Sequence, residues 1–257
     1  MAIPVFGSPE LTDTMLADLL RDDVPAGTRI VVVDNGGDYE LPEWAGAVSL
    51  YRPGRNLRWI GTANWAIATS FAESDDVCVV LNNDTRFSRN FLAALTAPLA
   101  ELHDAAVVAA CYDDFWLHQR ASVIPDSAEH YEPTSVLRDV PFCDGTAIAF
   151  SVKAMAELGP LDEAAFPRHG YGSDIDFALR ARAAGWRCVV TEGAYVSHLR
   201  RVTMTRTGQT AELNRSEILT GLDAKWGNDW RALAGLGPAA FPPHNTGSAS
   251  SWYLTSE

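Results

Sequence analysis

The sequence has few basic residues and no long apolar run, and each absence excludes a class of protein. Its 20 lysine and arginine residues face 33 aspartate and glutamate residues, and the net charge is −13. This charge argues against nucleic acid as a partner, because polyanions bind basic surfaces. No apolar run is long enough to span a bilayer. The N-terminus lacks a basic region followed by an apolar one, so we expect no signal peptide.

Paired cysteines and nucleotide-binding glycine loops are also absent. The four cysteines are scattered along the chain and form no C-x-x-C pair, which argues against a zinc site and a disulfide framework. We therefore expect a cytoplasmic location, with the inner face of the membrane as an alternative. The sequence has no Walker A loop, and no G-x-G-x-x-G follows a strand.

Short apolar runs alternate with helical patterns, which predicts an α/β domain with a mainly parallel sheet. The length of 257 residues and the 47% hydrophobic content suit one such domain. Ser8, Ser88 and Ser173 are expected to cap helices. Residues 112–142 are predicted to be irregular, and a loop of that length in a compact domain is usually functional or mobile. Strands are predicted at residues 2–6, 29–33, 48–51, 78–81, 106–110, 146–151 and 187–191, and helices at about 9–20, 65–71, 88–102, 152–158, 173–184 and 210–226.

The stretch at residues 78–85 organises the prediction. An apolar run from Cys78 to Leu81 reads as a buried strand, and it stops at Asn82-Asn83-Asp84. Ligands of open α/β sheets bind beyond the carboxyl ends of the strands. Asp84 is therefore placed where a hard cation is held by carboxylates and substrate phosphates. An ordinary turn is the alternative interpretation of the same three residues.

A basic loop precedes the predicted helix at residues 65–71. Arg52, Arg55 and Arg58 crowd this loop, together with Gly54 and Gly61. A helix N-terminus presents free N–H groups to an anion, and arginine adds bidentate contacts to phosphate oxygens. The pattern favours an anion site, and a solvated basic loop is the alternative.

Two later segments carry further candidate residues. Asp174 and Asp176 fall in the first turn of a predicted helix, where acids also simply offset the helix dipole. His198 follows the last predicted strand and precedes Arg200 and Arg201. Taken alone, His198 is more typical of an ordinary surface or core histidine than of a ligand.

In this order and spacing, the segments resemble those of family 2 glycosyltransferases, closest to the rhamnosyltransferase-like branch. The resemblance covers roughly residues 29–201 and rests on the segments at 34–37, 56–64, 81–85, 159–163 and 174–176, and on His198. It implies a GT-A (Rossmann-like) fold, with a mixed, mainly parallel sheet flanked by helices in a single domain. We divide that domain into a nucleotide-sugar-binding half at 1–110, an acceptor and catalytic half at 111–205, and a C-terminal helix and tail at 206–257.

The resemblance also implies an inverting transfer from a nucleoside-diphosphate sugar, assisted by Mn²⁺ or Mg²⁺. Asp84 matches the metal-binding carboxylate, and His198 matches the histidine that completes the metal shell in many members. Asp34 matches the acid that meets the nucleobase or ribose. The other donor-binding candidates are Asn56, Arg58, Asn64, Asn82, Asn83, Arg200 and Arg201.

On the acceptor side, Asp174 matches the general base of the family. Asp144, Trp116 and Asp176 are further acceptor-binding candidates. The expected acceptor is a hydroxyl of a glycan, a lipid-linked molecule or a small molecule. The tail from residue 235 is rich in Gly, Pro and Ser, and a homodimer through the C-terminal segment is a further expectation.

The chain departs from the family pattern at three positions, and two alternative functions stay open. Asn82 stands where many relatives have Asp, Ser173 where the branch usually has Glu, and Arg58 where the loop often has Gly. One alternative is a non-catalytic relative that binds nucleotide sugar. The other is a sugar-phosphate nucleotidyltransferase, which needs a basic Gly-rich loop where residues 7–10 read Gly-Ser-Pro-Glu.

Overall fold

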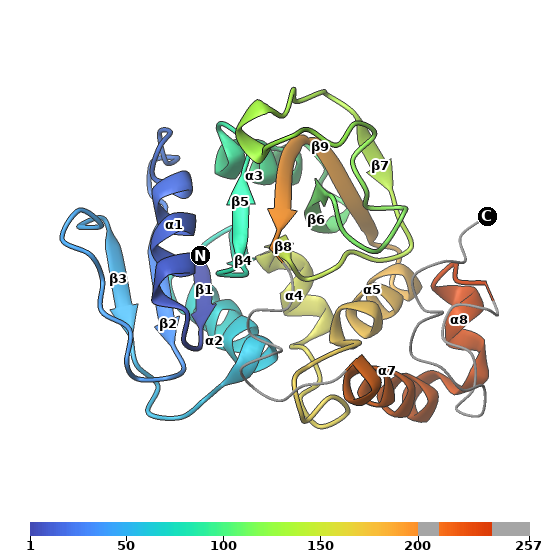
Figure 1. Ribbon diagram of the computed structural model, residues 1–257. Coiled ribbons are helices and arrows are strands. Elements are labelled where there is room, and N and C mark those ends of the chain that lie inside the picture. Colours follow the sequence, from blue (N-terminus) through green and yellow to red (C-terminus); the bar gives the residue numbers. More distant parts are fainter. Residues whose placement is uncertain (200–210, 238–257) are drawn as a thin grey trace.

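The computed structural model describes residues 1–199 and 211–237, and in this part of the chain nine strands form one sheet. Helices pack against both faces of the sheet (Figure 1). The N-terminal half contains β1 (Ala2–Val5), α1 (Pro9–Leu19), β2 (Ile30–Asp34), β3 (Val48–Tyr51), α2 (Arg58–Ala72), β4 (Val77–Leu81), β5 (Thr85–Phe87), α3 (Phe91–Glu101) and β6 (Ala105–Tyr112). The rest contains the 3₁₀ turn η1 (Ala128–His130), β7 (Leu137–Asp139), β8 (Ala147–Ser151), α4 (Val152–Leu158), α5 (Ser173–Ala183), β9 (Arg187–His198), α7 (Ala211–Trp226), the 3₁₀ turn η2 (Gly227–Asp229) and α8 (Trp230–Leu233).

The strand order is β3-β2-β1-β4-β8-β6-β9-β5, and β7 pairs with β9 outside this path. The pairings set β1, β2, β3, β4, β6 and β9 in one direction and β5, β7 and β8 in the other. The sheet is therefore mixed and mainly parallel, as predicted. Because β8 is antiparallel to β4 and β6, its amino end lies at the same edge as their carboxyl ends.

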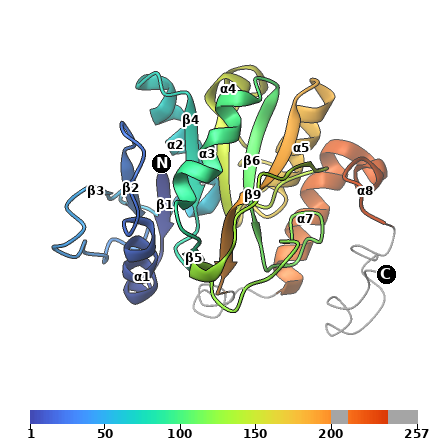
Figure 2. The ribbon, with the colours of Figure 1, turned by 90° about the horizontal axis from the view of Figure 1, so that it is seen from above.

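The core has one apolar layer on each face of the sheet. Figure 2 shows the helices that cover the two faces. Side chains of α2, α4 and α5 pack on one face, and those of α1 and α3 on the other. Successive residues of β4 alternate between the layers, with Cys78 and Val80 in the first and Val79 and Leu81 in the second. This alternation is why a strand buried on both faces reads as a continuous apolar run.

The predicted elements are confirmed, with corrections at their ends. Helix α2 begins at Arg58, seven residues before the predicted start, so Asn64 lies in the helix and not in the loop before it. Asn90 occupies the N-cap position of α3, and the Ser88 hydroxyl instead accepts a hydrogen bond from the backbone N–H of Tyr195. Gly172 occupies the N-cap position of α5, and Ser173 is its first helical residue. Ser8 lies at the N-cap position of α1 but makes no side-chain cap bond. The capping predictions for Ser88 and Ser173 were therefore wrong.

The predicted strand at 187–191 is longer in the structure, and two short strands were missed. β9 continues to His198, with a register shift against β6 between Ala110 and Cys111. β5 and β7 have three residues each and pair with β9. No helix in the described ranges is long and apolar enough to cross a membrane.

Candidate active site

Polar side chains gather at one edge of the sheet, where six strands present the ends that carry them. Four of these ends are carboxyl ends of strands that run in the same direction, and the antiparallel strands β5 and β8 contribute their amino ends. The backbone N–H of Asn82, after β4, donates to the carbonyl of Thr146, before β8, at 2.9 Å and joins these two ends. The residues at or just after the strand ends are Asp34, Asn82, Asn83, Asp84, Asp113, Asp114 and His198, with Asp144 before β8.

His198 and Asp84 are in direct contact at this edge. β5 pairs with β9 so that Thr85 lies opposite His198, which brings the preceding Asp84 to the imidazole. Nε2 of His198 lies 3.2 Å from Oδ1 of Asp84, and Nδ1 lies 2.7 Å from Oδ2 of Asp114. The side chains of Asp84 and His198 are 9% and 18% exposed, so the pair is largely shielded from water. The imidazole therefore bridges two carboxylates.

Neighbouring groups fix the charge and position of this imidazole. Burial alone lowers the pKa of His198, but its hydrogen bonds to Asp114 and Asp84 outweigh burial and raise the pKa to about 10. Asp113 accepts hydrogen bonds from the backbone N–H of His198 at 3.1 Å and the hydroxyl of Ser197 at 2.7 Å. The histidine is thus held from its backbone and from both ring nitrogens.

The residues present fit a divalent cation that substrate oxygens complete. No group of three or more acidic, histidine or cysteine side chains forms a closed metal cage within residues 1–199 and 211–237. Asp84 can nevertheless supply an oxygen ligand, and His198 a nitrogen ligand at the same point once Nε2 has released its proton to make way for the cation. A carboxylate on the other ring nitrogen, here Asp114, is the usual second partner of a metal-binding histidine. Cations that act on nucleotides are commonly held by one or two protein groups and by phosphate oxygens.

Asp174 and Asp144 form a second carboxyl pair near the same edge. Asp174 is half-buried in the first turn of α5, and burial together with the nearby Asp144 raises its pKa to about 7. Burial also raises the pKa of Asp144, whose Oδ1 accepts bonds from the backbone N–H and the hydroxyl of Thr146. A carboxyl group that titrates near neutral pH is suited to accept a proton from a substrate hydroxyl.

Asp34 organises the loop that follows β2. Its buried carboxylate accepts hydrogen bonds from the backbone N–H groups of Gly36, Gly37 and Tyr39 at 3.1, 2.7 and 3.1 Å. Arg52 adds an ion pair to the same carboxylate, with Nε at 3.2 Å. All these partners belong to the protein, so Asp34 shapes this edge through the loop at residues 35–39.

Residues 55–58, which belong to the predicted basic loop, line a small cavity of about 180 Å³. Asn56 lies on its wall and accepts the backbone N–H of Arg58 at 2.7 Å. Arg58 has a left-handed backbone with φ 61°, and its guanidinium donates to the carbonyl of Pro167. A glycine adopts that conformation without a penalty. The cavity is lined by Arg55, Asn56, Leu57, Arg58, Ile60, Glu163, Phe166 and Pro167.

Asn64 and Asn83 bond to other parts of the protein. The Asn64 amide donates to Leu161 O and Glu163 Oε1 and accepts from the N–H of Leu161, which ties α2 to the segment before α5. Asn83 is buried and donates to the hydroxyl of Thr12 at 3.0 Å. Asn82 is half-buried at the sheet edge. Among these three, Asn82 is the residue best placed to meet a ligand.

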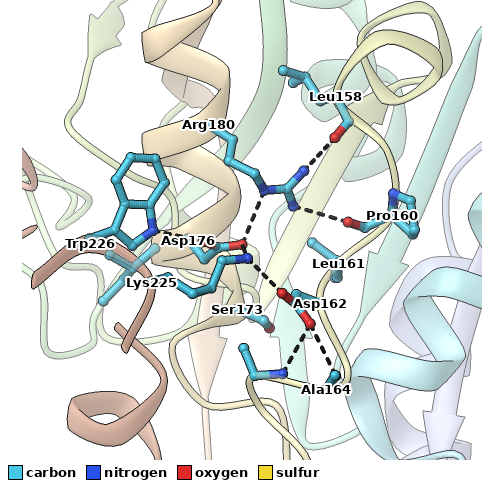
Figure 3. Close-up of polar contacts among 12 residues, drawn as sticks. Leu158, Pro160, Leu161, Asp162, Ala164, Ser173, Asp176, Arg180, Lys225 and Trp226 are labelled. Carbon is cyan, nitrogen blue, oxygen red and sulfur yellow. Dashed lines mark hydrogen bonds and ion pairs between the residues drawn. The ribbon is translucent and has the colours of Figure 1, made fainter. Parts of the chain in front are cut away.

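The remaining candidate residues lie in different parts of the structure. Trp116 packs edge-on against Phe142, with ring centroids 4.9 Å apart, in the loop that follows β6 and carries Asp113 and Asp114. Asp176 is not part of the site edge: its fully buried carboxylate pairs with Arg180, Lys225 and Trp226 (Figure 3). Arg200 and Arg201 lie outside the described residues.

Several site residues were missed by sequence reasoning. Asp113 and Asp114 follow a buried strand just as Asp84 does, so the repeated pattern of a strand ending in an acid was the available signal. The ring of Trp59 packs so closely on Gly145 that a Cβ there would lie 2.5 Å from it. The indole N–H of Trp59 is buried and has no hydrogen-bond partner within the described part of the chain. Trp59 therefore packs beside the residue that follows Asp144, with a buried donor that the described side chains do not satisfy.

Comparison with known proteins identifies relatives and a fold. No protein-family model matches the chain. The uncharacterized proteins Rv1525 and MT1576 of Mycobacterium tuberculosis and Mb1552 of Mycobacterium bovis are each 38% identical over 203 residues, which cover 79% of this chain and 74% of theirs.

Among solved structures, GalNAc-T7 with UDP, GalNAc and Mn²⁺ has a TM-score of 0.63 and 14% identity over 90% of this chain. The chain spans 48% of that protein, about half its length. The mannosyltransferase PcManGT of Pyrobaculum calidifontis, with GDP-Man and Mn²⁺, has a TM-score of 0.52 and 12% identity over 91% of this chain and 77% of its own. These likenesses confirm the predicted GT-A fold.

Proposed function

Because the chain belongs to one family with the mycobacterial proteins Rv1525, MT1576 and Mb1552 and has the GT-A fold, we propose that it is a metal-dependent glycosyltransferase. It transfers a sugar from a nucleoside-diphosphate sugar to an acceptor hydroxyl with inversion, in the manner of family 2 enzymes of the rhamnosyltransferase-like branch. The observation that carries the proposal is the contact between Asp84 and His198 at the carboxyl ends of β4 and β9. The UDP, GDP-Man and Mn²⁺ of the two structural neighbours support a nucleotide-sugar donor.

Asp84 and His198 would hold Mn²⁺ or Mg²⁺ together with the diphosphate of the donor. When bound, such an ion neutralises the negative charge that develops on the leaving diphosphate. Asp114 bonds to Nδ1 of His198 and so keeps Nε2 directed toward the cation position. Arg200 and Arg201, which follow His198 in the chain, are proposed to add positive charge to the same group.

Asp174 is the proposed general base. The acceptor oxygen bonds to the anomeric carbon as the bond from that carbon to the diphosphate oxygen breaks, and the hydroxyl proton passes to the Asp174 carboxylate. Attack from the face opposite the leaving group inverts the anomeric centre and needs no enzyme nucleophile. A pKa of about 7 lets Asp174 be ionised at neutral pH and still be basic enough to take the proton.

We propose that the donor and the acceptor both bind at this edge of the sheet. We assign the nucleotide to residues 1–110, where Asp34 orders the loop after β2 and Asn56 and Arg58 border the cavity. The acceptor is assigned to residues 111–205, near Asp144 and Trp116. A glycan, a lipid-linked molecule and a small molecule all offer the hydroxyl that this chemistry needs. A cytoplasmic location and a dimer through the C-terminal segment remain predictions.

The test is donor consumption. The protein is incubated with UDP-, dTDP- and GDP-sugars, Mn²⁺ and a panel of sugar, lipid-linked and small-molecule acceptors, and released nucleoside diphosphate is measured. We expect release with one donor class, and its loss on adding EDTA or in Asp174→Asn. If the protein binds a nucleotide sugar but consumes none of the donors with any acceptor, the result supports the alternative of a non-catalytic nucleotide-sugar-binding protein.

A further inference from the structure

Helix α7 contacts the short segment that leads into the proposed general base. In Figure 1 this helix lies beside α5, although the two are far apart in the sequence. The contact centres on Glu217, which is 5% exposed. Glu217 has no role in the mechanism above, yet a buried carboxylate needs a compensating set of donors.

Three consecutive backbone N–H groups supply those donors. Oε1 of Glu217 accepts from Arg168 at 2.7 Å, His169 at 3.0 Å and Gly170 at 3.3 Å, and Oε2 accepts from His169 at 3.1 Å. Charge-assisted bonds of this kind are stronger than bonds between neutral groups. Glu217 therefore fixes the backbone of residues 168–170.

Close packing leaves this segment little freedom to move. Gly170 and Gly172 have left-handed backbones with φ 89° and 94°. A Cβ at Gly170 would lie 2.7 Å from Ile60 of α2, and one at Gly172 would lie 3.3 Å from the Cα of Ile218 in α7. The segment is thus held between α2 and α7, the helix that carries Glu217.

The fixed segment leads directly to Asp174. The carbonyl of Gly170, whose N–H bonds to Glu217, accepts hydrogen bonds from the backbone N–H of Ser173 at 3.1 Å and from its hydroxyl at 2.6 Å. Ser173 is the first residue of α5, and Asp174 is the second. A short chain of hydrogen bonds therefore connects the Glu217 carboxylate to the backbone that carries Asp174.

A second contact fixes the first turn of α5 against a later turn of α7. The Asp176 carboxylate accepts from Nζ of Lys225 at 3.0 Å and Nε1 of Trp226 at 2.9 Å, and Lys225 also pairs with Asp162 at 2.7 Å (Figure 3). These bonds hold the helix α5 itself, whereas Glu217 holds the segment at residues 168–172 that precedes it.

We propose that Glu217 is a positioning residue of the transfer site: its carboxylate holds residues 168–172 in the conformation that places Asp174 against the acceptor hydroxyl. This inference rests on the proposed function for its catalytic part and on the hydrogen bonds of Glu217 for its structural part. A general base displaced by about 1 Å loses up to about 100-fold in rate, while donor binding at the opposite side of the site is unaffected.

The test compares Glu217→Gln with Glu212→Gln, the same change at an exposed position of α7. Hydrogen exchange and single-turnover transfer are measured on the full-length protein, with Mn²⁺-dependent affinity for nucleoside diphosphate as a third readout. In Glu217→Gln we expect the amides of residues 168–170 and the first turn of α5 to exchange at least about tenfold faster. Transfer should fall about 10- to 100-fold with unchanged nucleotide affinity. Glu212→Gln should match the wild type.

The outcomes separate this inference from the proposed function. Unchanged exchange at residues 168–175 overturns the inference whether or not the protein transfers sugar. Faster exchange with wild-type transfer shows a purely structural contact and also overturns it. A wild-type protein that consumes no donor refutes the proposed function, and exchange alone then decides whether Glu217 orders the segment. If Glu217→Gln does not fold, Glu217→Asp, which keeps a shorter carboxylate, is measured in the same way with the same criteria.

Discussion

Nε2 of His198 lies 3.2 Å from Oδ1 of Asp84, and this contact joins the carboxyl ends of two strands that are far apart in the sequence. Both residues come from positions where a buried strand ends, so the rigid sheet sets their separation. The other imidazole nitrogen bonds to Asp114. Asp84 and Nε2 of His198 are placed to hold a divalent cation, with Asp114 behind the histidine as its second partner.

We expect His198→Ala to weaken Mn²⁺ binding, and Asp84→Ala to weaken it more, because the carboxylate contributes charge as well as a ligand atom. Asp114→Asn should cost about 10- to 100-fold in metal affinity, the usual effect of changing the carboxylate behind a metal-binding histidine. Mn²⁺ affinity is measured by calorimetry or by the electron paramagnetic resonance signal of free Mn²⁺. If His198→Ala binds Mn²⁺ with wild-type affinity, His198 is not a metal ligand and is an ordinary partly buried histidine.

Asp174→Asn should lose about 10²–10⁴-fold in transfer, because an amide cannot accept the acceptor proton. Donor and metal affinity should stay as in the wild type, since Asp84 and His198 are untouched. Single-turnover transfer and nucleotide titration on the same preparation separate the two effects. If Asp174→Asn keeps more than about a tenth of wild-type transfer, another residue is the base, and Asp144 is the nearest candidate.

The raised pKa of Asp174 also predicts how pH acts on rate and stability. The base must be ionised, so kcat/KM should rise with pH through about 7. Because the folded state binds this proton more tightly than the unfolded state, whose carboxyl titrates near 4, the stability contribution of Asp174 falls as pH rises between about 4 and 7. Asp174→Asn removes this loss and should raise Tm at pH 8 by about 2–4 °C, the effect of about 1 kcal/mol. A Tm difference between the variant and the wild type that is the same at pH 4 and pH 8 would contradict the assignment.

Asp176→Asn, the same substitution two residues further on, should have the opposite effect on stability. Its carboxylate is fully buried and offsets the charges of Arg180 and Lys225, so its removal leaves uncompensated cations. Breaking a buried pair in this way costs about 3–5 kcal/mol. Thermal unfolding should show a Tm lower by several degrees, with metal-dependent nucleotide binding retained below the transition. An unchanged Tm would show that solvent replaces these bonds easily.

The parallel half of the sheet was predictable because its signals are local. Strands β1, β2 and β4 are short apolar runs that alternate with helical patterns, and β2 and β4 end at polar residues. β5 and β7 were not predictable, since three residues carry no periodic signal. The continuation of β9 was hidden by Glu192, a buried acid in mid-strand whose partners Ser122 and Arg138 come from the irregular 112–142 segment.

The sequence predicted that the site residues lie at the ends of strands, but it predicted few of the bonds between their side chains. Order along the chain and family resemblance pointed to Asp84, His198 and Asp174, and the structure brings Asp84 and His198 together. The sequence placed Asp176 in the first turn of α5, but it did not reveal that Lys225 and Trp226 cover its carboxylate. Asp114 and Glu217 act through groups far away in the sequence, so only the folded structure shows what they bond to.

The most direct test of a metal-dependent nucleotide site at Asp84 and His198 is titration of UDP, dTDP and GDP with and without Mn²⁺, in the wild type and in Asp84→Ala. Asp76→Ala is the matched control, because this exposed acid lies next to the opposite end of the same strand. We predict that one nucleoside diphosphate binds the wild type and Asp76→Ala only when Mn²⁺ is present, and that Asp84→Ala abolishes this binding without lowering helix and strand content. Equal Mn²⁺-dependent affinity in Asp84→Ala, or no binding of any of the three nucleotides to the wild type, would contradict the account.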